Sequence, residues 1–313
     1  MTTTESSTLP LLLEEVEAVR VERLSPSFVR VELASPALAE FGVDGPLYDQ
    51  RIKLIFPGGN GLPSFAGADE SWMTTWFEQP EEDRGYMRTY TVRDVVGEGA
   101  DTRVVVDFVV HGADEPSGPG GDWGAHAAVG DRVVAMTPRR GVPFGGIEFD
   151  PEQATQLLLV GDETALPAIA SILEDLPADA RGSVFVEVPV AADIQQLRRP
   201  AGVTVTWLPR EGGARGAEIH GAVLDLLGAD VAEPVVDEID PDLWETPTYS
   251  SSGEDVETPV RLVGHEYDGL YAWIAGEAKL VTGLRRALVK DLGIDRRQVC
   301  FMGYWRVGVA MKS

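Results

Sequence analysis

The sequence predicts a two-domain protein, with an N-terminal antiparallel β-barrel over residues 1–150 and an α/β domain with a parallel sheet over residues 151–313. The chain has 313 residues and 44% hydrophobic content, enough to bury more than one domain core. In the first half, short runs rich in Val, Ile, Tyr and Thr are interrupted by Pro, Gly and Ser, a pattern typical of strands. In the second half, from about Gln156, apolar runs alternate with turns and helical segments, which is typical of a parallel sheet covered by helices.

The individual elements follow from these two patterns. Strands of the first domain are predicted over residues 16–24, 29–33, 51–56, 87–94 and 102–110. Strands of the second domain are predicted over residues 157–160, 184–188, 203–207, 271–275 and 298–302. A helix is predicted over 276–292, because its apolar residues share one face. An acidic insertion at about 229–260 is rich in Pro and Ser and is predicted to be a loop, since it offers little apolar surface to bury.

Charge and cysteine content exclude several functional classes. The chain has 26 Lys and Arg against 51 Asp and Glu, a net charge of −25 that disfavours binding to nucleic acid or to anionic membranes. The N-terminal segment matches neither a signal peptide nor a spanning helix, so we expect a cytoplasmic protein. A monomer is the working expectation, and the sequence leaves the oligomeric state open. With Cys300 as its single cysteine and no metal-ligand spacing among its four histidines, the chain is predicted to have neither a disulfide nor a resident metal.

The most informative motif is MRTYTVR at residues 87–93, on a predicted strand. Alternation places Arg88, Tyr90 and Val92 on one face and the residues between them on the other, unless a bulge intervenes. A flavin site needs such a mixture, with an aromatic plane for the isoalloxazine, a hydroxyl or amide near N5 and guanidinium groups for the diphosphate. An ordinary amphipathic strand with surface arginines would have the same pattern.

A glycine-rich segment at residues 118–127 fits a neighbouring role. Gly118, Gly120 and Gly121 would let a ligand approach the backbone closely, and a following helix would direct free amide groups at phosphate. Such segments are also ordinary loops. His111, shortly before it, is open to two interpretations, as a ligand contact or as a structural histidine.

In the second domain, LLLVGDETALPAI at residues 157–169 combines a strand, a turn and a helix, but it lacks the G-x-G-x-x-G pattern. An ordinary strand-to-helix junction would look the same. Glu187 ends the next strand, where an acid accepts ribose hydroxyls and repels a 2′-phosphate, which favours NADH. Three arginines would favour NADPH instead: Arg198, Arg199 and Arg210. A barrel followed by an α/β domain indicates a flavin module joined to a pyridine-nucleotide module.

Four motifs, in order along the chain, resemble those of the siderophore-interacting proteins, flavin-dependent ferric-siderophore reductases related to ferredoxin reductases. They are RTYTVR at 88–93, DFVVHG at 107–112 followed by Gly118, Pro119 and Trp123, YAWIAGEA at 271–278, and GYWRVG at 303–308. The resemblance runs from about Val16 to Gly308, apart from the acidic insertion. It implies FAD as cofactor, NADH or NADPH as electron donor, and a ferric siderophore as substrate that is reduced to release Fe(II).

The resemblance and the reasoning above assign three groups of residues. The candidates for FAD binding are Arg88, Thr89, Tyr90, Thr91, Val92, Arg93, Asp107, Val109, His111, Gly118, Gly121 and Trp123. The candidates for NAD(P)H binding are Gly161, Asp162, Thr164, Ala165, Glu187, Gly276 and Glu277. The candidates for substrate binding are Lys53, Arg139 and Arg306, with Arg140 as an alternative to Arg139, and each could instead be a surface charge. No catalytic acid or base is assigned, because electrons would pass through the flavin.

Two other functions stay open. A ferredoxin- or flavodoxin-type reductase would share both domains but would need a basic docking patch, and only residues 261–313 are locally basic. A non-catalytic protein that binds an iron complex would need no turnover. Bound flavin that NADH or NADPH bleaches would distinguish a reductase from a carrier.

Overall fold

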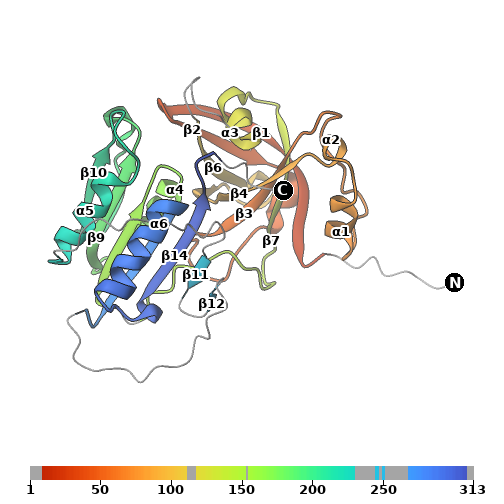
Figure 1. Ribbon diagram of the computed structural model, residues 1–313. Helices are drawn as coiled ribbons and strands as arrows, with labels where there is room; N and C mark the ends of the chain where they lie inside the picture. The colour runs from red at the N-terminus through yellow and green to blue at the C-terminus, as the bar shows by residue number, and fades with distance from the viewer. Residues whose placement is uncertain are drawn as a thin grey trace. The chain divides into compact units, whose positions relative to one another are not determined.

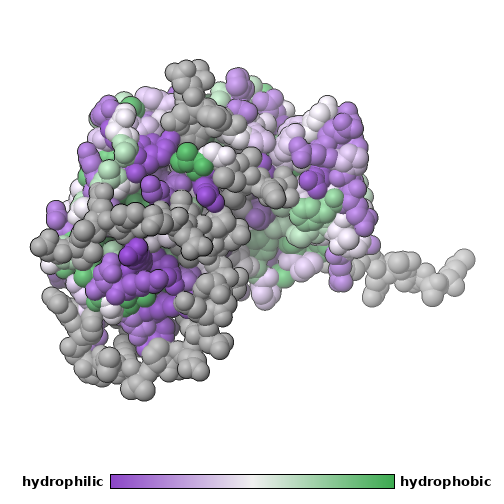
Figure 2. All heavy atoms as spheres, in the orientation of Figure 1, coloured by the Kyte–Doolittle hydropathy of each residue, from purple (hydrophilic) through white to green (hydrophobic). Residues whose placement is uncertain are grey.

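The computed structural model describes residues 9–110, 118–152, 154–229, 244–246, 249–250 and 267–308. These residues form two units (Figure 1), the first ending at Ile147 and the second beginning at Glu148, close to the boundary predicted after residue 150. Within the described residues, each unit contains one sheet of seven strands. Among the residues that Figure 2 colours by hydropathy, hydrophilic side chains predominate on the face shown, as the net charge of −25 leads one to expect.

The first unit is an antiparallel β structure. Its strands are β1 (Leu11–Ser25), β2 (Phe28–Ala34), β3 (Arg51–Phe56), β4 (Tyr86–Thr91), β5 (Asp94–Val96), β6 (Arg103–Val109) and β7 (Arg132–Pro138). Its α-helices are α1 (Trp72–Phe77), α2 (Glu81–Arg84) and α3 (Pro119–His126). Neighbouring strands pair antiparallel in the order β4-β3-β7-β1-β2-β6-β5, which confirms the predicted antiparallel domain.

The sheet of the first unit curls strongly. Its two edge strands, β4 and β5, are consecutive in the chain, and only Val92 and Arg93 separate them. A flat sheet of this width would hold its edges about 29 Å apart, because strands lie about 4.8 Å from one another. A link of two residues spans only about 10 Å. The sheet must therefore curl until its edges meet, and the motif at residues 88–93 lies at this seam.

Backbone hydrogen bonds hold the seam. Arg93 N donates to Val105 O of β6, and Val92 N donates to Gln50 O just before β3. The core inside the curled sheet consists of alternate strand residues, among them Val104, Val106 and Phe108 of β6. The opposite face of β3 and β7 packs against the tryptophans of α1.

The second unit has a mainly parallel sheet. Its strands are β8 (Gln156–Gly161), β9 (Arg181–Val188), β10 (Gly202–Pro209), β11 (Trp244–Thr246), β12 (Tyr249–Ser250), β13 (Leu270–Glu277) and β14 (Val299–Trp305). Its α-helices are α4 (Leu166–Asp175), α5 (Ala217–Leu226) and α6 (Ala278–Arg285), the last followed by a π-helical segment, Arg286–Asp291. The order is β10-β9-β8-β13-β14-β11-β12, and the first five strands pair parallel, which confirms the predicted α/β domain.

Helices α5 and α6 lie on one face of this sheet (Figure 1), where Ile219 and Val223 of α5 share a core with Val281 of α6. The helix predicted over 276–292 begins two residues later than expected. Gly276 still belongs to β13 and has a φ of +142°, and Glu277 caps α6. Among the described residues, no helix is both long and apolar enough to cross a membrane.

The acidic insertion is not wholly a loop, which corrects the prediction for residues 229–260. Residues 244–246 form β11, antiparallel to β14, and pair with β12. The Trp244 ring stacks on Tyr304 with centroids 6.0 Å apart, and buried Glu245 accepts from Arg285 Nε at 2.5 Å and Nη2 at 2.9 Å. The insertion has too little apolar surface to form strands by itself. Strand β11 forms because it pairs with β14, at the edge of a sheet that is already present. Apart from Ala229, the rest of the insertion lies outside the described residues.

Candidate cofactor sites

The flavin motif, RTYTVR at residues 88–93, begins on β4 in the register that the sequence predicts, and its last two residues follow that strand. Tyr90 pairs with Ile52 and Arg88 with Leu54, and both partners belong to the core of the curled sheet. The predicted alternation of Arg88, Tyr90 and Val92 is therefore confirmed. Lys53 pairs with Thr89 on the other face of the two strands.

Tyr90 belongs to an aromatic cluster that also contains Phe56, Phe108 and Trp123. The Tyr90 ring lies 4.6 Å from Phe108 and 5.9 Å from Phe56, centroid to centroid, and Trp123 of α3 lies 5.6 Å from Phe56. Burial raises the pKa of the Tyr90 hydroxyl, so this group remains a hydrogen-bond donor at neutral pH.

Two glycines seat α3 on this cluster. A Cβ at Gly120 would overlap the Tyr90 hydroxyl, and a Cβ at Gly124 would lie 2.6 Å from Phe108 Cβ. The glycine-rich segment is therefore needed for close helix packing, a signal that the sequence offered and that we interpreted only as access for phosphate. Gly121 and Trp123 lie on α3 itself, and Gly118 is its exposed N-cap residue.

The start of α3 suits the diphosphate of FAD. Within the described residues no side chain caps this helix, so the amides of Gly120 and Gly121 in its first turn remain available to an anion. Arg88 supplies a cation on β4, with Nη1 donating to Met87 O at 2.7 Å, and burial lowers the pKa of its guanidinium. His111 lies outside the described residues.

Two other FAD candidates lie on the far side of β6. Asp107 and Val109 alternate with Val106 and Phe108, so they face away from the core that holds Tyr90. The Asp107 carboxylate accepts from Arg30 Nε and Nη2, each at 2.7 Å, and this pairing raises the pKa of Arg30. The structure does not bring Asp107 together with Tyr90 and Trp123.

The three basic candidates for substrate binding have different surroundings. Lys53 Nζ donates to Thr89 Oγ1 at 2.6 Å, directly beside the flavin motif, and burial lowers the pKa of this ammonium group. Arg139 links separate segments of the first unit, because its Nε donates to Leu9 O at 3.2 Å and its Nη1 donates to Glu40 Oε2 at 2.8 Å.

Arg140 is similarly engaged, with Nη2 donating to Phe41 O at 3.0 Å. Arg306 follows β14 in the second unit, is half-buried, and forms no ion pair within the described part of the chain. Of the basic candidates in the first unit, only Lys53 is therefore placed beside a cofactor motif.

In the second unit, the strand order reverses between β8 and β13. The chain runs outward from β8 through β9 to β10 and then returns to β13 on the other side of β8. In open parallel sheets, ligands bind at the carboxyl ends of the strands beside such a reversal. Gly161 ends β8 there, and Gly276 and Glu277 end β13. The structure therefore brings the predicted nucleotide segments together, although they lie far apart in the sequence.

Asp162 fastens the loops at this reversal point. Its carboxylate accepts hydrogen bonds from Thr164 N at 2.9 Å, Thr164 Oγ1 at 2.6 Å, Glu277 N at 2.7 Å and Trp305 Nε1 at 2.8 Å. Burial and the neighbouring Glu163 raise the pKa of Asp162 to about 6, although the donors from Thr164 and Trp305 act against this shift. With about four acceptor positions on a carboxylate, Asp162 is saturated by the domain itself.

Glu277 and the two glycines shape the same point. Glu277 Oε2 accepts from Lys279 N at 2.7 Å and so caps α6. A Cβ at Gly276 would lie 2.7 Å from Asp162 Cγ, and a Cβ at Gly161 would lie 3.0 Å from Ile169 Cδ1. Glycine is required at both positions for close packing.

A charged cluster, formed by Glu163, Glu187, Arg210 and Arg215, lies beside Asp162. Arg210 donates to both oxygens of Glu163, at 2.7 and 2.8 Å, and to Glu187 Oε1 at 3.0 Å. Arg215 Nη1 donates to Glu163 at 2.6 Å, and its guanidinium lies 5.0 Å from the centroid of Trp305. Sequence reasoning identified Glu187 and Arg210 but missed Glu163 and Arg215.

The pKa values in the charged cluster follow from burial and pairing. Burial alone would raise the pKa of Glu163, but the hydrogen bonds and charge of Arg210 hold it below its usual range. For Glu187, burial prevails and the pKa is raised. Burial would lower the pKa of Arg210, yet its two carboxylate partners raise it.

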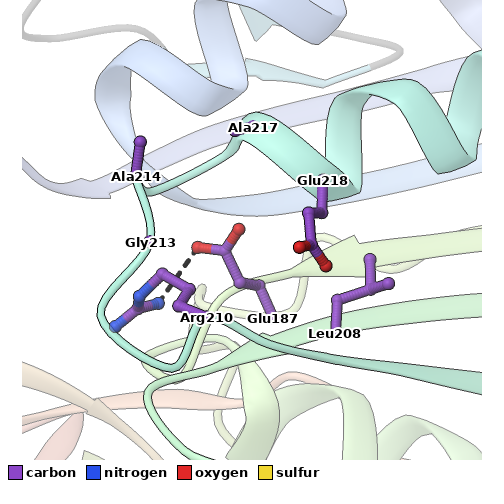
Figure 3. Close-up of a pocket in the computed structure, with 7 residues that line it drawn as sticks. All are labelled: Glu187, Leu208, Arg210, Gly213, Ala214, Ala217 and Glu218. Carbon is purple, nitrogen blue, oxygen red and sulfur yellow. Dashed lines mark hydrogen bonds and ion pairs between the residues drawn. The ribbon is translucent and has the colours of Figure 1, made fainter.

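A small pocket opens next to the charged cluster, at the carboxyl ends of β9 and β10 (Figure 3). Its volume is about 60 Å³, and it is lined by Glu187, Leu208, Arg210, Gly213, Ala214, Ala217 and Glu218. Figure 3 shows the Glu187 and Glu218 carboxylates on the same side of α5, with Arg210 bonded to Glu187.

Comparison with known proteins identifies the family. Residues 17–142 match the Siderophore-interacting FAD-binding domain, and residues 154–308 match the Siderophore-interacting protein family. An uncharacterized protein of Mycobacterium tuberculosis is 31% identical over 311 residues, covering 95% of this chain and 91% of that protein.

Two further relatives carry names. Ferric vibriobactin reductase ViuB of Vibrio cholerae is 27% identical over 297 residues, covering 94% of this chain and 89% of ViuB. The crystal structure of a siderophore utilization protein from T. fusca superimposes with a TM-score of 0.67 at 30% identity, covering 97% of both chains.

The barrel, the matched flavin domain and the parallel sheet define an FAD-binding oxidoreductase. More narrowly, the chain belongs to the siderophore-interacting protein family, as the sequence motifs predicted.

Proposed function

We propose that the protein is an NAD(P)H-dependent flavin reductase that delivers electrons to ferric siderophores. The observation that carries this proposal is Lys53, a partly buried cation that donates to Thr89 inside the flavin motif of a chain whose net charge is −25. Bound FAD would convert a two-electron hydride donor into one-electron steps, which the reduction of Fe(III) requires.

Residues of the first unit would hold the flavin. Arg88 and the free amides at the start of α3 suit the diphosphate, and Tyr90 offers an aromatic ring with a protonated hydroxyl. Thr91 and Arg93 lie on the same seam.

A pyridine nucleotide is the proposed electron donor. The reversal between β8 and β13 supports this, because dinucleotides bind at the carboxyl ends of strands at such a point. Asp162 and Glu277 would act by holding the loops in place, since hydrogen bonds within the domain already occupy Asp162 and since Glu277 caps α6.

A ferric siderophore is the proposed acceptor. The name of ViuB describes a ferric vibriobactin reductase, and most of each chain is covered in that comparison. A ferric catecholate complex is anionic, and Lys53 is a cation that such a complex would meet beside the flavin motif. Arg306 is a second candidate, whereas the hydrogen bonds of Arg139 to Leu9, Leu11 and Glu40 favour a structural role.

The direct test is anaerobic stopped-flow spectroscopy of the purified protein. We expect a bound flavin that NADH or NADPH bleaches, followed by reoxidation when a ferric catecholate is added, with Fe(II) captured by a ferrous chelator. A protein that binds no flavin, or whose reduced flavin is not reoxidised by ferric complexes, would contradict the proposal.

Lys53→Ala tests the acceptor site. We expect slower reduction of an anionic ferric siderophore and unchanged reduction of a small neutral dye. Arg132→Ala is the matched control, because Arg132 is an exposed cation of the same unit that pairs with Glu15 and Glu17. Equal losses with the siderophore and with the dye would show that Lys53 is structural.

A further inference from the structure

We propose that the pocket beside the charged cluster makes this protein select NADH over NADPH, with Glu187 and Glu218 as the residues that determine the choice. The inference rests on the proposed function, since it concerns the adenosine end of the electron donor. In a sheet of this strand order, an acid at the end of the second strand accepts the ribose hydroxyls, and an arginine nearby accommodates a 2′-phosphate. Glu187 lies near the end of β9, the second parallel strand.

Arg210 follows the carboxyl end of β10, where an arginine could bind a 2′-phosphate, but two carboxylates already neutralise its charge. Its guanidinium forms three hydrogen bonds with Glu163 and Glu187, and its side chain is only 7% exposed. Glu163 is fully buried, at 0% exposure. Turning Arg210 toward a phosphate would leave a buried carboxylate with one partner fewer, which is costly.

Arg215 is engaged in the same way. Its Nη1 donates to Glu163, and its guanidinium lies over the ring of Trp305. The two arginines and two acids of the charged cluster therefore balance. Glu218, exposed in the first turn of α5, adds one negative charge to the pocket.

The other arginines considered for a 2′-phosphate are at the wrong end of the sheet. Arg198 and Arg199 precede β10, whose 8 residues span about 26 Å. They therefore lie at the amino edge of the strands, whereas nucleotides bind at the carboxyl edge. Arg198 pairs with Glu174, and Arg199 Nε donates to Val203 O at 2.9 Å.

The amino end of α5 is also unfavourable for binding a phosphate. The amide of Gly216, its N-cap residue, donates to both oxygens of Glu187, at 3.1 and 2.9 Å. Glu187 and Glu218 thus already neutralise the positive end of this helix. The 2′-phosphate of NADPH has a charge of roughly −1.5 to −2, so Glu187 and Glu218 would repel it. The ribose hydroxyls of NADH are neutral donors, and the carboxylate of Glu187 can still accept a hydrogen bond from them.

The experiment is anaerobic flavin reduction in the full-length, FAD-loaded protein with each nucleotide. We expect the second-order rate constant of flavin reduction by NADH to exceed that by NADPH by at least about tenfold, because like charges would oppose only the phosphorylated nucleotide. The ratio should fall as salt is raised from low to high concentration, because salt screens exposed charges. A steric barrier would leave the ratio unchanged.

Glu218→Arg should lower the preference for NADH at least severalfold by raising the second-order rate constant of flavin reduction by NADPH. Asp225→Arg is the matched control, since Asp225 is an exposed acid near the other end of α5, and it should leave the ratio unchanged. Equal or better use of NADPH by the unmodified protein, or identical ratios in the two variants, would overturn the inference. If neither nucleotide reduces a flavin that dithionite does reduce, the proposed electron donor itself is wrong.

Discussion

Replacing Arg210 with alanine should destabilise the second unit more than almost any other change of a charged residue. Arg210→Ala would remove three hydrogen bonds and leave Glu163, at 0% exposure, with Arg215 as its cation partner among the described residues. Breaking a buried ion pair from one side costs about 3–5 kcal/mol. Because Arg215 remains, we expect the lower end of this range, about 3 kcal/mol.

The assay is thermal unfolding followed by tryptophan fluorescence, with FAD absorbance as a separate signal for the first unit. A loss of about 3 kcal/mol corresponds to a fall in Tm of roughly 6–12 °C for a unit of this size. The matched control is Arg198→Ala, because Arg198 belongs to the same unit, pairs with Glu174 and has a side chain that is 81% exposed. Its loss should cost less than about 0.5 kcal/mol.

The effect of Arg210→Ala should also depend on pH. In the unmodified protein the pKa of Glu163 is lowered, so its ionisation stabilises the fold above the unfolded-state pKa, and this contribution is lost as pH falls through the folded-state value. In the variant, burial acts with less opposition and penalises the charged form. The difference between the two proteins should therefore shrink below about pH 4.5. Similar Tm values for the Arg210 and Arg198 variants at pH 7 would refute this reasoning.

Three further predictions concern other parts of the fold. Gly120→Ala should weaken FAD retention, measured by equilibrium dialysis, because its Cβ would overlap the Tyr90 hydroxyl. Gly145→Ala, an exposed position of the same unit whose Cβ would meet no atom of the described residues within 4 Å, should not, and equal losses would argue against this packing role. Asp162 has a pKa raised to about 6, so its stabilising contribution is present below 3.8 and is lost as pH rises through 6. The unfolding free energy of Asp162→Asn relative to the unmodified protein should therefore rise by roughly 2.4 kcal/mol between pH 4 and pH 7 in urea titrations, and a flat difference would refute the shift. Arg139→Ala should lower Tm without slowing siderophore reduction at a temperature where the variant is folded, whereas a selective loss of that reduction would restore Arg139 as a substrate residue.

The sequence was sufficient to predict the fold class because side-chain periodicity alone distinguishes the two units. It was less informative where an element depends on distant residues. Helix α5 was not predicted, since Gly216 at its start has a left-handed φ of +78° and no side chain to cap the helix. Its amide is instead satisfied by Glu187, 29 positions earlier in the chain.

In the candidate sites, too, features that depend on local geometry could be predicted, and contacts between distant residues could not. The alternation of Arg88, Tyr90 and Val92 could be predicted because strand geometry is local. The bond between Glu163 and Arg210 joins residues 47 positions apart, and only the fold of the parallel sheet brings them together. Arg139 was considered as a substrate residue because the sequence cannot show that the backbone oxygens of Leu9 and Leu11 hold its guanidinium.

The hydrogen bond between Arg139 and Leu9 spans 130 positions, and β1 and β7 pair over nearly the same separation. During synthesis β1 emerges first and can pair with β2 at once, but its other edge must wait for β7. At about 5–20 residues per second the wait is roughly 6–25 s. For that time a long strand has an unpaired edge, which is the kind of surface on which nascent chains associate. Slow, chaperone-dependent maturation of the flavin domain is the expected consequence of this topology.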